Sequence, residues 1–178
     1  DNVVIFEAIG DHFSRAGESG KAYRHLAGTA LKLWQRSLTA EAWDMSERAV
    51  ILAESASGDL SPQEFDKARV GVLRVRAYMS YNRGSWEQAE HILASLQAVA
   101  TKLGERKLAA EAILDRGVAL KRLGRADAGR RMIEDVVEKA RSSGDRGMVM
   151  EGLRRLALYA WEKGDLDTCE ELASQGLF

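Results

Sequence analysis

The sequence predicts an all-α fold of about nine antiparallel helices. Apolar residues recur at the helical spacing of three and four, as in Leu93, Leu96 and Val99, and the alternation typical of β-strands is absent. Glycines interrupt this pattern along the chain, because glycine adopts the left-handed conformation that ends a helix without a Cβ clash. These breaks fall at Gly17, Gly58, Gly84, Gly104, Gly124, Gly144 and Gly164.

The predicted helices follow one another through short turns, and several begin at recognisable caps. Their ranges are 2–16, 18–37, 40–57, 62–82, 85–103, 105–122, 125–142, 145–162 and 165–178. The clearest start is the stretch SPQE at 61–64, where serine can cap, proline suits the first helical position and glutamate completes a capping box. Ser85 with Gln88 offers a similar start, and Asp145 and Asp165 can cap the last two helices.

Composition restricts the class of protein. The chain has 178 residues, of which 46% are hydrophobic and 30% charged, with a single proline, so it is neither disordered nor membrane-embedded. The 26 Lys and Arg nearly balance the 27 Asp and Glu, so no overall basic field attracts nucleic acid or an anionic membrane. The single cysteine, Cys169, excludes an internal disulfide and fits a reducing compartment, and we expect a cytoplasmic location.

A 40-residue repeat organises the helices. Gly84, Gly124 and Gly164 are 40 residues apart, and a small residue follows each after five positions: Ala89, Gly129 and Cys169. Gly17 and Ala22 repeat this five-residue spacing, and Asp44 with Ala49 fits the same register one period before Gly84. A fixed period of this size, filled by two helices, predicts a helical solenoid in which each glycine forms a turn and each small residue allows close packing.

The repeat resembles the tetratricopeptide repeat (TPR). Besides Gly-x-x-x-x-Ala between two amphipathic helices, that family often has a small residue seven positions before the glycine, which Gly10, Ala77, Gly117 and Ala157 supply here. The resemblance implies a right-handed superhelix of four to five helix pairs. This chain differs from the family in its 40-residue period, which exceeds the usual period of about 34, and in the missing proline at the end of each repeat.

The resemblance covers nearly the whole chain and implies a single array over 1–178. Its pairs would be 1–38, 39–57 with 62–82, 85–122, 125–162 and an incomplete 165–178. The stretch AIGDHFSRAGESGKAYRHLAGTALKL is similar to arrays in large multidomain bacterial signalling ATPases, kinases and transcription regulators. Because the chain starts without methionine and stops inside an amphipathic pattern, we expect it to be a fragment of a larger protein.

Catalytic, cofactor and metal sites are not predicted. The pair Gly20-Lys21 suggests a phosphate loop, but that motif needs glycine at Arg15, a hydroxyl at Ala22 and a preceding β-strand. The three histidines are scattered, and Cys169 fits a packing position better than that of a nucleophile. The chain is therefore predicted to be no enzyme. Arginines at 122–131 and 154–155 alternate with acidic residues, which favours an ordinary charged surface over a nucleic-acid site.

The first helix of each TPR-like pair is expected to line a concave, partner-binding surface. Arg74, Tyr78 and Tyr81 share one helix face because they are spaced i, i+4 and i+7. Arginine, tyrosine and tryptophan dominate binding hot spots. The 40-residue register extends this surface, so the predicted partner-binding residues are Arg74, Tyr78, Tyr81, Lys121, Arg154 and Trp161. Alternatively, the aromatic residues fill the core between helices, as we expect of Trp34, Trp43 and Trp86.

These features predict a non-catalytic protein-interaction or regulatory module of a multidomain bacterial protein. Its concave surface would bind a peptide, a helix or another domain of the same chain, without direct contact to nucleic acid or membrane. Two alternatives stay open: a domain that senses a small effector or a signalling peptide, and a scaffold that self-associates through exposed end helices.

Overall fold

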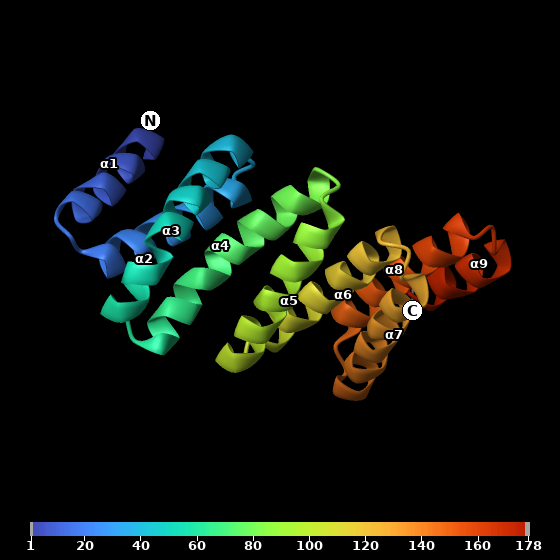
Figure 1. The fold of residues 1–178 in the computed structure, drawn as a ribbon. Coiled ribbons are helices and arrows are strands. Elements are labelled where there is room, and N and C mark those ends of the chain that lie inside the picture. The colour runs from blue at the N-terminus through green and yellow to red at the C-terminus, as the bar shows by residue number, and fades with distance from the viewer. Residues whose placement is uncertain (1, 177–178) are drawn as a thin grey trace. The chain divides into compact units, whose positions relative to one another are not determined.

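The computed structural model describes residues 2–176 and is shown in Figure 1. Within these residues the chain forms nine α-helices and no β-strand, which confirms the predicted all-α class. The helices are α1 (Asn2–Arg15), α2 (Ser19–Gln35), α3 (Thr39–Asp59), α4 (Pro62–Asn82), α5 (Trp86–Leu103), α6 (Arg106–Arg122), α7 (Ala126–Ser143), α8 (Arg146–Glu162) and α9 (Leu166–Gln175). Each predicted boundary lies within two residues of the observed one, except the predicted end at 178, which lies outside the described residues.

Glycine turns separate most of these helices. Six glycines adopt the left-handed conformation, with φ between 70° and 78°: Gly17, Gly84, Gly104, Gly124, Gly144 and Gly164. After Gly124, the Arg125 N–H donates to the Leu120 carbonyl at 2.9 Å, so the turn also satisfies a carbonyl at the helix end. Three of the predicted caps are confirmed: the 61–64 stretch forms the full capping box, Asp145 accepts from the Met148 N–H at 3.0 Å, and Asp165 accepts from the Thr168 N–H at 3.1 Å.

One predicted break is slightly misplaced. Gly58 lies inside α3, which continues to Asp59, and the extended Leu60 makes the turn. The register that aligns Asp44 with Gly84 does not correspond to a turn, because Asp44 lies exposed inside α3. The turn before α3 is formed instead by Ser37, which has a φ of 63° although it carries a side chain.

The helices divide into two compact units, each described by itself. Unit 1 comprises residues 1–84 with 102–104, and unit 2 comprises 85–101 with 105–178. In unit 1, α2 packs against α1, α3 and α4, and in unit 2, α6 and α8 pack against each other and against α7. The even-numbered helices within each unit are thus direct neighbours. One continuous array over the whole chain stays a prediction.

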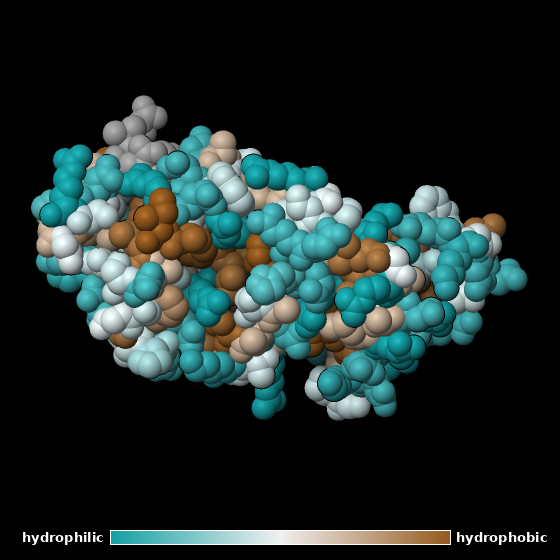
Figure 2. All heavy atoms as spheres, in the orientation of Figure 1, coloured by the Kyte–Doolittle hydropathy of each residue, from teal (hydrophilic) through white to brown (hydrophobic). Residues whose placement is uncertain are grey.

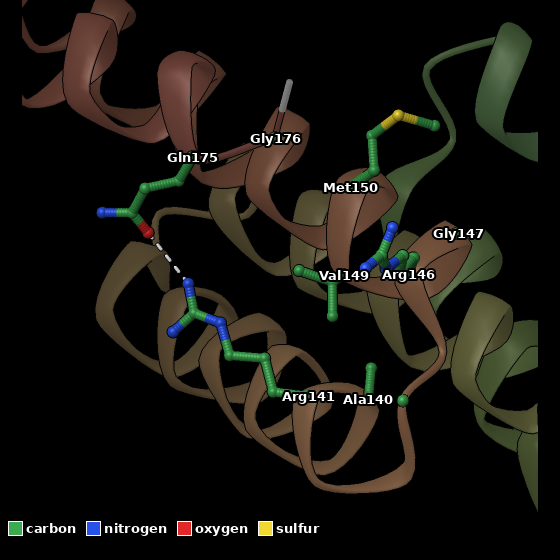
Figure 3. Close-up of a pocket in the computed structure, with 9 residues that line it drawn as sticks. Ala140, Arg141, Arg146, Gly147, Val149, Met150, Gln175 and Gly176 are labelled. Carbon is green, nitrogen blue, oxygen red and sulfur yellow. Dashed lines mark hydrogen bonds between the residues drawn. The ribbon is translucent and has the colours of Figure 1, made fainter. Parts of the chain in front are cut away.

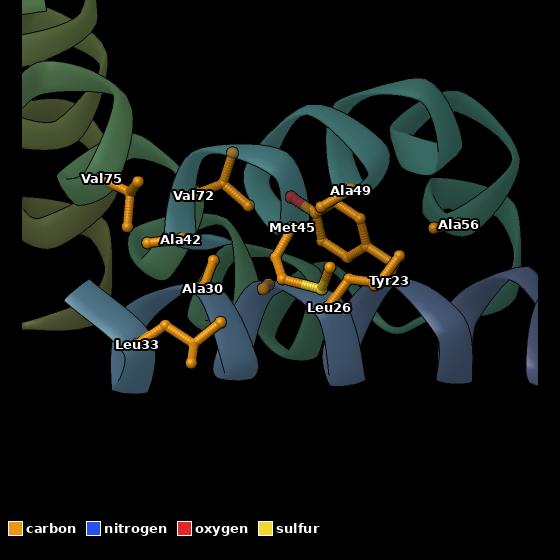
Figure 4. Close-up of a cluster of buried hydrophobic side chains, with 11 residues drawn as sticks. Tyr23, Leu26, Ala30, Leu33, Ala42, Met45, Ala49, Ala56, Val72 and Val75 are labelled. Atoms are coloured by element: carbon orange, nitrogen blue, oxygen red, sulfur yellow. The ribbon is translucent and has the colours of Figure 1, made fainter. Parts of the chain in front are cut away.

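The core of unit 1 lies between α2, α3 and α4 (Figure 4). Tyr23 is 1% exposed, and its ring rises from α2 toward Ala49 on α3, beside Met45. The ring also stacks on Phe65 at 4.9 Å between centroids. Burial raises the pKa of the Tyr23 hydroxyl to about 12, because the charged form would lose its solvation.

The core of unit 2 depends on a close approach of α6 and α7. Gly117 and Gly129 face each other so closely that a Cβ on either would overlap the neighbouring helix. Tyr159 of α8 reaches the same place, and its hydroxyl donates to the Gly117 carbonyl at 2.6 Å. Among the other small residues that the repeat predicts, Ala22 and Ala89 are fully buried and Cys169 is half-buried.

The described helices show no membrane-crossing character. Across residues 2–176, none of them combines the length and the apolar composition that a membrane crossing requires.

Candidate protein-binding site

Three of the predicted site residues lie on α4. Arg74 and Tyr78 both contact Trp34 of α2: the Arg74 Cζ lies 5.2 Å from the centroid of the Trp34 ring, and the Tyr78 ring lies 5.5 Å from it. Tyr78 is 41% exposed, whereas Arg74 and Tyr81 are half-buried. The opposite side of α4 contributes Val72 and Val75 to the core. These three residues therefore lie at the rim of unit 1 and do not fill its interior.

Trp34 was predicted from the sequence to pack in the core, and it was not among the predicted partner-binding residues. Its ring is half-buried and packs against the hydrophobic core, as expected. It also supports the Arg74 guanidinium and the Tyr78 ring, so it orients both. We call Trp34, Arg74 and Tyr78 the α2–α4 cluster.

A second tryptophan in unit 1 already has its cationic partners within the chain. Trp43 of α3 lies between two guanidinium groups, with the Arg76 Cζ at 4.9 Å and the Arg83 Cζ at 4.6 Å from its ring centroid. Arg76 also pairs with the carboxylate of Glu47. The electrostatic partners of Trp43 are thus supplied by the chain itself, which makes it an internal packing element.

The predicted site residue Lys121 forms internal contacts. Its side chain is only 13% exposed, its ammonium lies 2.8 Å from the Glu162 carboxylate, and it lies 4.2 Å from the centroid of the Tyr159 ring. The hydrogen bond from Lys121 lowers the pKa of Glu162. Lys121 therefore connects α6 to α8, and it presents little surface to a partner.

The remaining predicted residues, Arg154 and Trp161, lie on an exposed side of α8. Trp161 is 59% exposed, and Leu158 on the same helix is 39% exposed. Arg154 donates to the Glu151 carboxylate at 2.9 Å and 3.2 Å. This hydrogen bonding is the main reason that the pKa of Glu151 falls to about 2, and Arg155 adds to the effect. The α8 residues and the α2–α4 cluster belong to different units.

Unit 2 also contains a pocket of about 490 Å³ between α7, α8 and α9 (Figure 3). Val149 and Met150 form part of its apolar wall. Arg141 donates to the Gln175 side chain at 2.8 Å across one side, and Arg146 lines another. The lining has no acidic, histidine or cysteine side chain, so it offers no general base and no nucleophile.

Hydrophobic surface also occurs on α3. Ile51 is 79% exposed and Val50 is 45% exposed. On the face drawn in Figure 2, hydrophobic spheres gather over the region where α3 lies in Figure 1. These aliphatic residues provide a useful comparison, because they are exposed in the same unit but lie on a different helix from the α2–α4 cluster.

The glycine-lysine pair that resembles a phosphate loop lies in the first turn of α2. There the Gly20 N–H donates to the Asp59 carboxylate at 3.0 Å, and the Lys21 ammonium lies 2.5 Å from Glu18. Both groups thus bind carboxylates of the chain. In the part of the chain that the structure describes, no group of three or more His, Cys, Asp or Glu side chains could hold a metal ion.

No known family model and no curated protein sequence matches this chain.

Proposed function

We propose that this chain is a non-catalytic protein-interaction module built as a right-handed, TPR-like solenoid. The recurrent glycine turns support this architecture, as do the direct contacts of α2 with α4 and of α6 with α8. The predicted partner-binding residues lie on α4, α6 and α8, which are the second helices of the pairs predicted from the sequence and not the first, so we place the binding layer on the even-numbered helices. From the sequence similarity to bacterial signalling arrays, we place it in the cytoplasm, within a multidomain signalling or transcription-regulating protein.

The observation that carries this proposal is the α2–α4 cluster. Trp34 packs against both Arg74 and Tyr78, and Tyr78 keeps 41% of its surface exposed. An aromatic ring and a guanidinium that already pack against a neighbouring ring lose less conformational entropy when a partner binds than free side chains do. Binding hot spots are enriched in these residue types. The module would therefore bind a polypeptide segment at this cluster.

The test is selection of a displayed random peptide library against the 1–178 chain, followed by affinity measurement. We expect selected peptides to bind Tyr78→Ala at least about tenfold more weakly than the parent chain, because a hot-spot truncation costs about 2 kcal/mol or more. Ile51→Ala is the matched control, since it removes a more exposed side chain from the same unit. Its affinity should stay within about twofold of the parent value.

Two results would contradict the proposal. One is the absence of any selected peptide whose binding depends on Tyr78. The other is a large loss of helical circular dichroism in Tyr78→Ala, which would show that the residue belongs to the core.

A second candidate function is effector sensing at the pocket between α7, α8 and α9. Its volume of about 490 Å³ lies within the range of small-molecule sites. A melting-temperature increase caused by a small carboxylate and abolished by Arg146→Gln would support this function, and equal increases in both proteins would exclude the pocket.

A further inference from the structure

The helices of unit 1 differ strongly in charge. The neighbouring helices α2 and α4 together carry seven basic residues and two acidic ones, and α2 has no acidic residue at all. By contrast, α3 carries five acidic residues and one basic residue. The whole chain is nearly neutral, with a formal charge of -1, so the positive charge is a local property of helices α2 and α4. We call these two helices the α2–α4 layer.

The two acidic residues of α4 lie in its first two turns and already have partners. Asp66 is 6% exposed, and the Lys102 ammonium lies 2.5 Å from its carboxylate. Glu64 closes the capping box and pairs with Arg24 at 3.2 Å. No acidic residue follows them on α4, so the half of the helix that carries Arg74 has no carboxylate of its own.

Two arginines on α4 stack on tryptophans, and they differ in one respect. Arg76 lies over Trp43 and is paired with Glu47. Arg74 lies over Trp34, but it has no carboxylate partner among the side chains that the structure describes. The stacking holds both guanidiniums in place, yet only Arg76 has the anion that such a group binds best.

We propose that the partner segment at this site is acidic: one of its carboxylates pairs with Arg74, and an adjacent apolar side chain covers Tyr78. This inference rests on the proposed function and specifies the chemistry of the partner. Lys67 lies seven residues before Arg74 on the same face of α4 and is exposed, so it extends the basic surface toward a second acidic residue.

A polypeptide fits this surface better than nucleic acid does. The acidic residues of α3 belong to the same unit, and charges are screened beyond about 8 Å at physiological ionic strength. The basic layer therefore acts on groups docked directly on it and gives a long polyanion no extended positive field. An apolar side chain next to a carboxylate, which a peptide supplies and a phosphate backbone does not, would also bury the exposed ring of Tyr78.

The test uses a short fluorescein-labelled peptide in which glutamate alternates with leucine and tyrosine, together with its glutamine counterpart. Fluorescence anisotropy with the 1–178 chain should show at least about tenfold tighter binding of the glutamate peptide. Arg74→Gln should remove most of this preference. Arg15→Gln is the matched control, because it removes an exposed charge that has no ion pair among the described residues of unit 1.

Several results would overturn the inference. They are equal binding of the two peptides, equal behaviour of Arg74→Gln and Arg15→Gln, no binding of the glutamate peptide up to about 1 mM, or its displacement by a single-stranded oligonucleotide that binds more tightly. The peptide-library selection distinguishes a failure of the acidic-partner inference from a failure of the proposed binding function. Selected peptides that depend on Tyr78 but contain no excess of acidic residues would leave the function intact and refute the acidic partner.

Discussion

Gly129→Ala tests the close contact of α6 and α7 on which the packing of unit 2 depends. A Cβ at Gly129 would overlap the Gly117 carbonyl oxygen and would lie 2.5 Å from the Tyr159 hydroxyl. The Gly117 carbonyl belongs to the backbone and cannot rotate away from the added Cβ. The Tyr159 hydroxyl is held nearby because it donates to the same carbonyl. The two helices must therefore move apart, and Tyr159 must give up its hydrogen bond.

The magnitude follows from three contributions. Replacing glycine by alanine inside a helix stabilises by about 1 kcal/mol. Overpacking against a fixed neighbour costs about 1 to 3 kcal/mol, and the lost Tyr159 hydrogen bond costs about 1 kcal/mol more. We therefore expect the free energy of unfolding of unit 2 to fall by about 2 kcal/mol, although alanine is the better helix former.

The assay is urea-induced unfolding followed by far-ultraviolet circular dichroism, with matched glycine-to-alanine controls. Gly147, in the first turn of α8, has only the Asp145 carboxylate 3.5 Å from an added Cβ, and Gly28 in α2 has nothing within 4 Å. Alanine at either position should stabilise its unit by up to about 1 kcal/mol. The reasoning fails if Gly129→Ala is as stable as the parent chain or if all three variants change stability in the same direction.

Two further predictions concern single residues. Ser37→Gly should raise the free energy of unfolding of unit 1 by about 0.5 to 1 kcal/mol in urea, because it relieves a side chain held at a φ of 63°; a neutral or destabilising effect would show that the turn is not strained. Stability that depends on Glu151 should be present above pH 4.5 and be lost as the pH falls toward 2, since its pKa is lower in the folded state than in the unfolded state. The side chain is 37% exposed, so solvent screening limits this contribution to about 1 kcal/mol. Melting temperatures measured across that pH range should decline less for Glu151→Gln than for the parent chain, and parallel declines would contradict the assignment.

The helices were predictable because their ends are determined locally. Gly124 and Gly144 end helices through their own backbone conformation, and Asp145 starts one through a single hydrogen bond. Each of these effects involves residues only a few positions apart, so it can be inferred from the sequence alone. The predicted boundaries agree with the structure for the same reason.

The spacing of the turns between the first four helices could not be predicted from such local signals. Successive turns from Gly84 onward are 20 residues apart, as are Gly17 and Ser37, but 47 residues separate Ser37 from Gly84. The seven extra residues lengthen α3 and α4, which have 21 residues each, whereas α6 and α7 have 17 and 18. Seven residues are about two helical turns, so the apolar face is retained and hydrophobic periodicity does not reveal the insertion. The 20-residue step from Gly17 was the signal that could have identified Ser37.

Residues 40 positions apart also differ in how far a neighbouring helix buries them. The repeat period in the sequence does not reveal this difference. Leu114 and Lys121 on α6 correspond to Arg154 and Trp161 on α8, 40 residues later. The α6 residues are covered because α8 packs on that side of α6: Leu114 is fully buried, and Lys121 pairs with Glu162. Trp161 is instead 59% exposed. A sequence period thus identifies residues with the same place on a helix, whereas the neighbouring helix decides which of them can meet a partner; this criterion excludes Lys121 and retains Arg74 and Tyr78.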